Sequence, residues 1–542
     1  MKKILLSSSF TIAIVLTLVT IIGGQHTQSV LAYGNSISEK MEIFRLILDT
    51  VQQRYVEEHS SEELLEYAIN GMLSKLDPHT SYMPVDNFKR WNKNFEGFQG
   101  IGIHYIFIDK APTITGFIAN SPAKDAGVEI GDQIQEVNGN SAIGLSRFEI
   151  ANIINNSPYS SLSLRIWRPQ ERQEHIFKIR RTHLNLKSVQ IKTMLQNGIG
   201  YINIDRFCSN TAFELDYALE SLTRQGMRSL VLDLRDNGGG YLSSAVEVAG
   251  RFLPPGKLIV YTMGKDPASY QEYRSSRDSH FSDLPITILI NHGTASAAEI
   301  VAGALQDWDR ALIVGETSFG KGLVQSQYRF KDGSALLVTT AKYYTPLGRL
   351  IQRNYYNRTK DQYYYDAYDE EARQPGQNKH EKQTFITERG RKVYGGGGIT
   401  PDIWIRNKEA AVSDELLDLY LNNNEQVLKF ALGLAANRPA LKQLPAHKLS
   451  KSIILHASEM QKLRSTLAEI DLNYTTAFFN KNEKDIRFLL KREIGYLSQG
   501  LLGRFSIAKD RDKQLKIAVA SEARAEALVQ FQLSHAGKEE TE

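Results

Sequence analysis

Ser296 lies in a sequence context that could make its hydroxyl reactive. Residues 291–300 read NHGTASAAEI; they follow an apolar run at 286–291, and apolar residues continue beyond them at helical spacing. This pattern predicts a buried strand, a short turn and a helix, with Ser296 near the helix N-terminus, where backbone N–H groups can bind an anion. Small neighbours would let a substrate carbonyl approach closely. The alternative is that Ser296 only caps the helix.

Lys321 is a candidate base for that hydroxyl. It lies 25 positions after Ser296, between two glycines in the segment GETSFGKGLVQ at residues 315–325. A lysine accepts a proton only when it is uncharged, so burial would have to lower its pKa from about 10.4 by roughly three pKa units, at a cost of about 4 kcal/mol. Gln325 follows four positions later, and on the same face of a strand it would orient the amine. The alternative is a solvated lysine in a glycine turn.

A glycine-rich loop could bind the oxygen of a reacting carbonyl. Residues 232–240 read LDLRDNGGG, so a buried strand ends in three glycines whose N–H groups can turn into a cleft. Together with the N–H of Ala297 they would form an oxyanion hole, in which each donor contributes about 10²–10³ in rate. The loop could instead cradle a phosphate, but the G-K-[ST] ending of a P-loop is missing.

Other catalytic systems find no support in the sequence. It contains no G-x-S-x-G and no H-E-x-x-H motif, and its single cysteine, Cys208, lies in no recognisable protease motif. One cysteine also excludes an intramolecular disulfide and a metal site built from several thiolates. The predicted chemistry therefore implies no metal ion and no organic cofactor.

The elements that must position these residues have the pattern of an α/β region at residues 182–405. Buried-type strands, with helical segments between several of them, are predicted at 198–204, 229–234, 286–291, 311–314 and 335–340. Short strands and turns predict a β-rich module at 95–181, and helical spacing predicts an N-terminal helical region at 35–94 and a C-terminal one at 406–542. The predicted fold class is multidomain α/β (α+β).

The β-rich module contains a loop suited to a peptide carboxylate. Gly100, Ile101, Gly102 and Ile103 place glycines before and inside the start of a strand, where consecutive N–H groups form a nest. A peptide could add as an extra strand beside residues 101–106 with its C-terminal carboxylate in the loop. A capped short helix, a turn, a strand and a hairpin follow, and this succession resembles a PDZ domain. The alternative is a β-rich spacer without a ligand.

Size and composition agree with a folded, multidomain chain. The 542 residues exceed one ordinary core, and hydrophobic and charged shares of 42% and 23% exclude a mainly disordered, collagen-like or polytopic membrane chain. The net charge of +4 gives no strong basic field, so nucleic acid is not an expected partner.

The N-terminus has the sequence pattern of an export signal. Lys2 and Lys3 precede an apolar run, and the small-residue pattern at 30–32 suits signal peptidase, so we expect residues 1–32 to be a signal peptide. An uncleaved membrane tether through residues 4–22 is the alternative. Either outcome exports the rest of the chain, to the periplasm or to the inner membrane facing the periplasm.

The segments around Ser296 and Lys321, the glycine loop at 238–240 and the PDZ-like module together resemble the carboxyl-terminal processing peptidases, or tail-specific proteases. The resemblance covers residues 35–405. The resemblance implies a Ser/Lys dyad at Ser296 and Lys321, supported by Gln325, with Gly240 as the oxyanion glycine. Asp307 falls where some members carry a supporting aspartate, although a helix-surface carboxylate is the alternative. The segments at 342–349 and 395–402 look like the family's substrate-cleft and closing motifs. The segment at 355–394 and the helices after 405 depart from the family pattern.

The resemblance implies an exported serine endopeptidase. Its PDZ domain would recognise accessible C-terminal tails of protein or peptide substrates, and cleavage would pass through an acyl-enzyme. Two alternatives stay open: a PDZ scaffold without activity, and an esterase or amidase that uses the same dyad. The C-terminal helical region could mediate a homodimer, dock an adaptor, cover the cleft or form a purely structural bundle.

Overall fold

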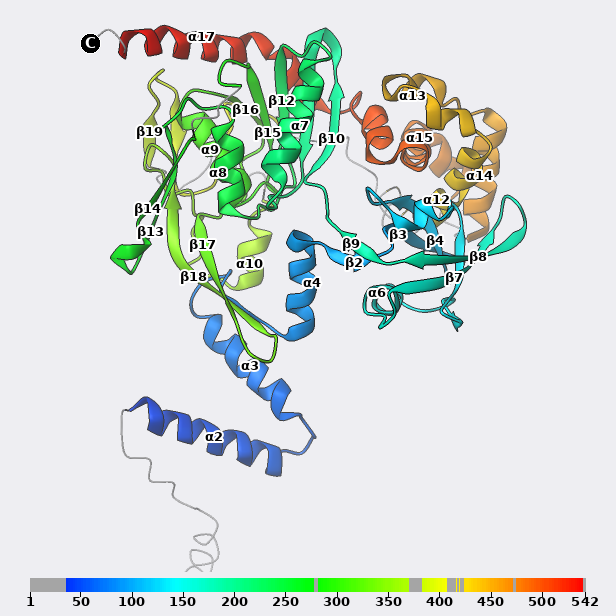
Figure 1. Ribbon diagram of the computed structural model, residues 1–542, viewed down its shortest axis with the longest axis horizontal. Helices are drawn as coiled ribbons and strands as arrows, with labels where there is room; N and C mark the ends of the chain where they lie inside the picture. The colour runs from blue at the N-terminus through cyan, green and yellow to red at the C-terminus, as the bar shows by residue number, and fades with distance from the viewer. Residues whose placement is uncertain are drawn as a thin grey trace, which may run out of the picture. The chain divides into compact units, whose positions relative to one another are not determined.

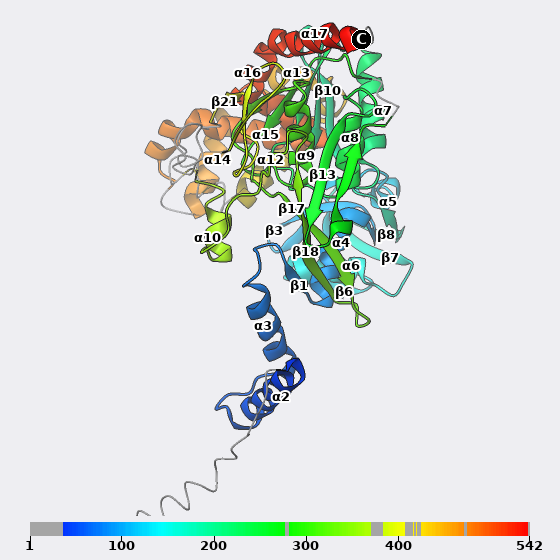
Figure 2. The same ribbon diagram turned by 90° about the vertical axis from the view of Figure 1, so that its left-hand side faces the viewer.

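The computed structural model describes residues 36–276, 281–369, 383–406, 416, 419, 424–470 and 474–539. The chain divides into two units, residues 1–76 and 77–542, and Figures 1 and 2 show its helices and strands in two views. The predicted signal peptide and the tether at 4–22 lie outside the described residues. Within the described ranges, no helix combines the length and the apolar character needed to cross a membrane.

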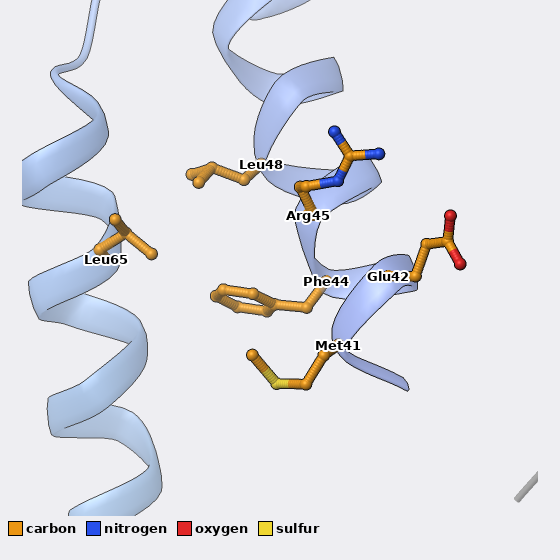
Figure 3. A pocket seen from close by; sticks show the side chains of 6 residues that line it. All are labelled: Met41, Glu42, Phe44, Arg45, Leu48 and Leu65. Atoms are coloured by element: carbon orange, nitrogen blue, oxygen red, sulfur yellow. The ribbon is translucent and has the colours of Figure 1, made fainter. Parts of the chain in front are cut away.

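The first unit contains two helices, as the helical spacing predicts. They are α2 (Ile37–Arg54) and α3 (Ser61–Leu73). Ser36 begins α2 with a reciprocal cap, in which its hydroxyl accepts the N–H of Glu39 and the Glu39 carboxylate accepts the N–H of Ser36. Figure 3 shows Phe44 and Leu48 of α2 pointing toward Leu65 of α3 across a mainly apolar pocket.

The second unit begins with a short segment that contributes a strand to a β-sheet. The Asp77 carboxylate accepts the N–H groups of His79 (2.8 Å) and Thr80 (2.9 Å), which makes a tight turn before strand β1 (Ser81–Met83). β1 pairs with a strand of the α/β region more than 250 residues later, and α4 (Val85–Glu96) then leads to β2 (Phe98–Gly100). The end of the predicted N-terminal helical region is therefore partly strand.

The β-rich module forms one sheet with two short helices. The strand order is β3-β4-β5-β7-β8, with β6 beside β5, so β3 lies at an edge of this sheet. The elements are β3 (Ile103–Ile108), β4 (Ala111–Phe117), α5 (Pro122–Asp125), β5 (Gln133–Val137), β6 (Asn140–Ser141), α6 (Arg147–Asn155), β7 (Ser161–Arg168) and β8 (Gln173–Arg180). β9 (Thr182–Leu184) pairs with β2 and closes the module.

A six-stranded sheet forms the core of the α/β region, with the order β10-β11-β12-β15-β16-β21. All neighbouring pairs are parallel except β10 with β11. The strands are β10 (Val189–Met194), β11 (Ile199–Ile204), β12 (Ser229–Asp233), β15 (Ile286–Ile290), β16 (Leu312–Gly315) and β21 (Ile403–Trp404). Helices α7 (Thr211–Thr223), α8 (Leu242–Gly250) and α9 (Ala297–Asp307) pack on one face, where residues such as Leu232 and Ile288 are buried.

A second sheet, in which every strand pair of the described chain is antiparallel, accompanies this core and includes β1. Its order is β1-β18-β13-β14, with β17 also paired to β18. The strands are β13 (Leu258–Gly264), β14 (Gln271–Arg274), β17 (Leu323–Arg329) and β18 (Ala335–Tyr344), followed by α10 (Lys360–Tyr365) and the hairpin of β19 (Thr384–Ile386) and β20 (Lys392–Tyr394).

The C-terminal helices complete the second unit instead of standing apart from it. They include α12 (Asn424–Ala436), α13 (Ala446–Ser452), α14 (Ala457–Ile470), α15 (Thr476–Ala508), α16 (Lys513–Ala520) and α17 (Glu522–Glu539). Leu515 of α16 and Leu528 of α17 pack on the second face of the six-stranded sheet, against Tyr201 and Val231. Both views show α17 beside the end of this sheet (Figures 1 and 2). At the other end, Lys429 of α12 pairs with Asp109 between β3 and β4 (2.6 Å).

Candidate active site

Ser296 stands on a strained turn between β15 and α9. Its backbone has φ +57° and ψ −118°, a conformation that L-residues rarely adopt and that costs on the order of 1–3 kcal/mol. A serine on such a strand–turn–helix corner presents its hydroxyl above the sheet, which is the arrangement known as a nucleophile elbow. The structure thus has the elbow's conformation although the G-x-S-x-G motif is missing from the sequence.

The predicted catalytic segments meet at one edge of the six-stranded sheet. β12, β15 and β16 are parallel neighbours, so the glycine loop after Asp233, the Ser296 turn after Ile290 and the Lys321 loop after Gly315 all leave their carboxyl ends. Parallel α/β sheets bind ligands at this edge. Main-chain hydrogen bonds also link these loops. The N–H of Phe319 donates to the carbonyl of Thr294 (2.8 Å), and the N–H of Ala295 donates to the carbonyl of Asn237 (2.9 Å).

Glu299 ties Ser296 and Lys321 together, although the analysis of the sequence did not single it out. Its fully buried carboxylate accepts the backbone N–H of Ser296 (2.8 Å), of Gly320 (2.7 Å) and of Lys321 (2.9 Å). It also accepts the hydroxyl of Ser318 (2.5 Å). Burial raises the pKa of Glu299, while these hydrogen bonds favour its charged form. The spacing Ser-x-x-Glu at 296–299 is a capping-box signal that could have revealed it.

Tyr343 of β18 makes a second link between the same two residues. Its hydroxyl contacts the carbonyl oxygen of Lys321 and lies 3.1 Å from the carbonyl oxygen of Ser296. The ring is buried, and burial, with the charge of Glu299 next, raises the pKa of Tyr343 well above its ordinary value. The phenol therefore stays protonated and can donate to these carbonyls, so the backbones of Ser296 and Lys321 converge on one hydroxyl and one carboxylate.

The environment of Lys321 shifts its amine toward the uncharged form. Burial lowers the pKa of Lys321 to about 8, against the opposing attraction of Glu299 and Asp77. With that pKa, about one amine in ten is neutral at pH 7. This direction agrees with the expectation for a lysine that serves as a base.

Gly239 and Gly240 have different roles in the glycine loop. A side chain on Gly239 would lie 2.8 Å from Ser296 Cβ and 3.0 Å from the nitrogen of Ala297, so this glycine makes the close approach. Its N–H donates to Asn237 Oδ1 (2.8 Å) and its carbonyl accepts the N–H of Phe207 (2.9 Å). Gly240 packs against the backbone of Phe207 and keeps an N–H without an acceptor in the described chain. This leaves Gly240 as the loop's candidate oxyanion donor, beside Ala297 at the start of α9, whose N–H the helix does not use.

Gln325 lies near the Lys321 loop, but not in the way that strand alternation suggests. Lys321 precedes β17, which begins at Leu323, and a bulge separates Val324 from Gln325. The Gln325 side-chain amide donates to Thr339 Oγ1 of β18 (3.2 Å). Its role in orienting the amine stays a prediction, because the shared strand face on which that role was argued does not extend to Lys321.

Asp307 is buried at the end of α9, so the alternative of a helix-surface carboxylate is wrong. Its carboxylate lies 2.5 Å from Arg349 Nη2 and accepts the N–H of Leu347 (3.0 Å). Both partners belong to the segment at 342–349, which resembles the substrate-cleft motif. Asp307 therefore holds the segment at 342–349 in place. Any support that it gives to Ser296 and Lys321 is indirect.

The predicted carboxylate loop of the β-rich module has its carbonyl groups turned inward. The carbonyl of Ile101 accepts the Ser121 hydroxyl and the Ala123 N–H (both 3.0 Å), and that of Gly102 accepts the Ile118 N–H (2.9 Å). A trans peptide points its carbonyl and the next N–H in opposite directions, so the N–H groups of Gly102 and Ile103 point away from these partners. Because β3 is an edge strand, this arrangement can accept a carboxylate and an added peptide strand.

Comparisons with known proteins identify the families of these regions. Residues 198–360 match the model of peptidase family S41, residues 113–168 match a PDZ domain, and residues 22–87 match the N-terminal domain of the activating protease CtpB. Of the described residues, no group of three or more His, Cys, Asp or Glu side chains is placed to hold a metal ion.

Individual relatives cover the chain in part. A protein of Staphylococcus haemolyticus (strain JCSC1435), named "Probable CtpA-like serine protease", is 34% identical over 62% of this chain and 67% of its own length. A protein of the same name from Staphylococcus aureus (strain bovine RF122 / ET3-1) is 36% identical over 55% of this chain and 60% of its own length. Among solved structures, the photosystem II D1 C-terminal processing protease shows 25% identity and a TM-score of 0.35, over 68% of this chain and 93% of that chain.

The match to the S. haemolyticus protein extends over two thirds of that relative, and the S41 match spans the glycine loop, Ser296 and Lys321. The fold class predicted from the sequence is confirmed, with a PDZ domain beside an α/β core. On this similarity, the chain belongs to peptidase family S41 and is a serine protease with a PDZ domain.

Proposed function

We propose that this protease is an exported endopeptidase that captures the C-terminal tails of proteins with its PDZ domain and cleaves them with a dyad of Ser296 and Lys321. One observation carries the proposal: a serine on a strained elbow and a lysine with a pKa of about 8 are fixed by the same buried carboxylate, Glu299. A serine that only capped a helix would not need a strained backbone. A lysine in a surface turn would not have a desolvated amine.

The reaction would proceed in two halves. The neutral amine of Lys321 takes the proton of the Ser296 hydroxyl as Oγ bonds to the peptide carbonyl carbon. The N–H groups of Gly240 and Ala297 stabilise the resulting oxyanion. The C–N bond then breaks, Lys321 returns the proton to the leaving amine, and an acyl ester remains on Ser296. Water adds to this ester, passing a proton through Lys321 to the Ser296 oxygen, and releases the other product as a carboxylic acid.

Capture of a substrate tail would use the edge of the PDZ domain. The outward N–H groups of Gly102 and Ile103 are suited to the terminal carboxylate, and β3 to main-chain pairing with the residues before it. The chemistry thus favours protein substrates with accessible C-termini. Export is proposed on the sequence of residues 1–32 alone, whether that segment is cleaved or tethers the chain.

The test is cleavage of peptides and folded proteins that differ only in their C-terminal residues, with products identified by mass spectrometry. The proposal expects cleavage that depends on a free C-terminal carboxylate and is lost in Ser296→Ala and Lys321→Ala, both of which remain folded by circular dichroism. A serine-directed phosphonate should add its mass to the wild-type chain but not to Ser296→Ala.

Other outcomes identify the alternatives. Tight peptide binding without turnover or phosphonate labelling would indicate an inactive PDZ scaffold. Faster turnover of simple esters than of any peptide would indicate an esterase. Full activity of Lys321→Ala would exclude the dyad.

A further inference from the structure

Helix α10, in the segment that departs from the family pattern, reaches the interior beside the Lys321 loop. Thr359 starts this short helix with a reciprocal cap to Gln362, which sets the direction of the three consecutive tyrosines that follow. Tyr363 is 0% exposed, whereas Tyr364 and Tyr365 are 38% and 77% exposed. One side chain of the helix is therefore selected for burial, and the other two remain at or near the surface.

The hydroxyl of Tyr363 contacts one polar group from the nearby sequence and one from a distant part of the chain. Gln352 Nε2 donates to it (3.0 Å), and His79 Nε2 lies 3.2 Å away. Burial, followed by repulsion from Lys321, lowers the pKa of His79 to about 3, so the imidazole is neutral and Nε2 can accept the hydroxyl proton. The other ring nitrogen, Nδ1, lies 3.4 Å from the hydroxyl of Tyr364.

This hydrogen-bonded chain ends on the residue after Lys321. Gln352 Oε1 accepts the N–H of Gly322 (2.8 Å), and the N–H of Arg353 donates to the carbonyl of Gly320 (2.9 Å). The backbone on both sides of Lys321 is thereby held by residues 352 and 353, and Tyr363 fixes the side chain of Gln352.

Aromatic rings close the same region. Phe319 packs edge-on against Tyr363, with ring centroids 5.8 Å apart. The Arg353 guanidinium carbon lies 4.6 Å from the ring centre of Phe319 and 4.3 Å from that of Tyr363. Rings and a stacked guanidinium leave little room for water on this side of the loop.

We propose that Tyr363 is a positioning residue for Lys321: through Gln352 and His79 it fixes the Lys321 loop and keeps water from this side of the amine. This inference rests on the proposed function, in which Lys321 is the base. It assigns to the segment at 355–369 the positioning of the proposed base.

The measurement that tests it is the pH dependence of kcat/KM for Tyr363→Phe, a change that keeps the ring and removes the hydroxyl. The wild-type profile should fall tenfold per pH unit below about pH 8, because only the neutral amine is a base. In Tyr363→Phe, greater hydration of the amine should raise the inflection by about one pH unit, so activity at pH 7 falls about tenfold and recovers near pH 10.

The charged and titratable groups that surround Lys321 are Glu299, Asp77, His79, Arg353, Tyr343 and Tyr363 itself. The substitution replaces none of the others, but it removes the hydroxyl that contacts His79 and Arg353 and that lies in the electrostatic surroundings of Tyr343. Gln352→Met provides a second variant, which breaks the chain at its other end while keeping a side chain of similar length. It should shift the inflection in the same direction, and the double variant should shift it no further than either single one.

Tyr365→Phe is the matched control, because it makes the same change on the exposed face of the same helix, and its profile should equal the wild type. The inference is overturned if Tyr363→Phe leaves the inflection in place, whether or not it lowers the plateau, since a lower plateau alone reports a structural defect. Activity in Lys321→Ala would contradict the proposed function instead, and is measured separately.

Discussion

Glu299 contributes no atom to the proposed proton transfers, yet its carboxylate is where the two reacting residues meet. Ser296, Gly320 and Lys321 each donate a backbone N–H to it. Three N–H groups and a hydroxyl around one buried carboxylate make up an arrangement that a neutral side chain cannot reproduce. In the proposed dyad, Glu299 is thus a positioning residue for Ser296 and Lys321.

Glu299→Gln should separate that role from simple packing. The glutamine keeps the shape but presents an NH₂ group to N–H donors, so at least one buried donor loses its acceptor, at a cost of about 1–3 kcal/mol. We expect kcat to fall by about 10²-fold or more, with a lower melting temperature. Glu220→Gln, on the exposed face of α7, is the control. Wild-type kcat in Glu299→Gln would show that the carboxylate does not position the dyad.

Lys321 should reduce the stability of the fold as well as serve as the base. An unfolded chain binds a proton at this amine up to about pH 10.5, while the folded protein releases it near pH 8. Folding therefore carries a penalty that is complete below pH 8 and disappears as the pH rises to 10.5, at most about 3 kcal/mol.

Lys321→Met removes this penalty. We expect the variant to unfold at a higher urea concentration than the wild type at pH 7, and at the same concentration at pH 10.5. Lys331→Met, in the exposed turn between β17 and β18, should unfold like the wild type at both values. A variant that is less stable at pH 7 would indicate that a partner stabilises the charged amine in the folded state, so that its pKa is not lowered.

At the scale of the elements, the strand–turn–helix corner depends on a glycine that sequence analysis could not distinguish from its neighbours. Gly238, Gly239 and Gly240 stand in a row, but only Gly239 faces Ser296 and Ala297 closely, with φ +99°. Gly238 has no atom within 4 Å of the position that a Cβ would occupy.

Gly239→Ala and Gly238→Ala therefore form a matched pair. The first places a methyl group 2.8 Å from Ser296 Cβ in a backbone conformation that alanine disfavours, so the elbow must move. We expect a loss of at least about 10²-fold in kcat/KM from a displacement near 1 Å, against less than twofold for Gly238→Ala. Equal activities of the two variants in a peptide-cleavage assay would contradict the close approach.

The sequence predicted the type and position of many of these helices and strands, because local apolar spacing determines them. The strand predicted at 198–204 is found as β11 (Ile199–Ile204), and the apolar run at 286–291 becomes β15. Lys321 was expected in a strand but lies in the loop before it, since the glycines on each side allow a loop and the strand begins only where β17 pairs with β18. Contacts such as that of His79 with Tyr363, 284 positions apart, depend on tertiary pairing that no periodicity encodes.

For the molecule as a whole, the question is whether the C-terminal helices are an attached module or part of the protease. Residues on alternate positions of the central strands face opposite sides, and both sides are buried: Leu232 under the helices α7–α9, and Val231 under α16 and α17. The Arg235 side chain also pairs with Asp512 just before α16 (2.7 Å), immediately before the glycine loop. This packing favours a structural role over a separate dimer or adaptor module.

Leu515→Asp tests that role. Leu515 packs against the sheet and is 3% exposed, so a carboxylate there would be buried without a partner. We expect the free energy of unfolding of the protease core to fall by about 4 kcal/mol or more. Activity at 37 °C should be lost as well. Lys516→Asp places the same charge on the exposed side of α16 and should unfold within about 0.5 kcal/mol of the wild type. If the helices were a separate module, Leu515→Asp would unfold them alone and leave kcat unchanged, because the sheet would not need their cover. Leu515 and Leu528 instead pack on the same strands that lead to the glycine loop and to Ser296. We therefore expect the geometry of the site to depend on these helices.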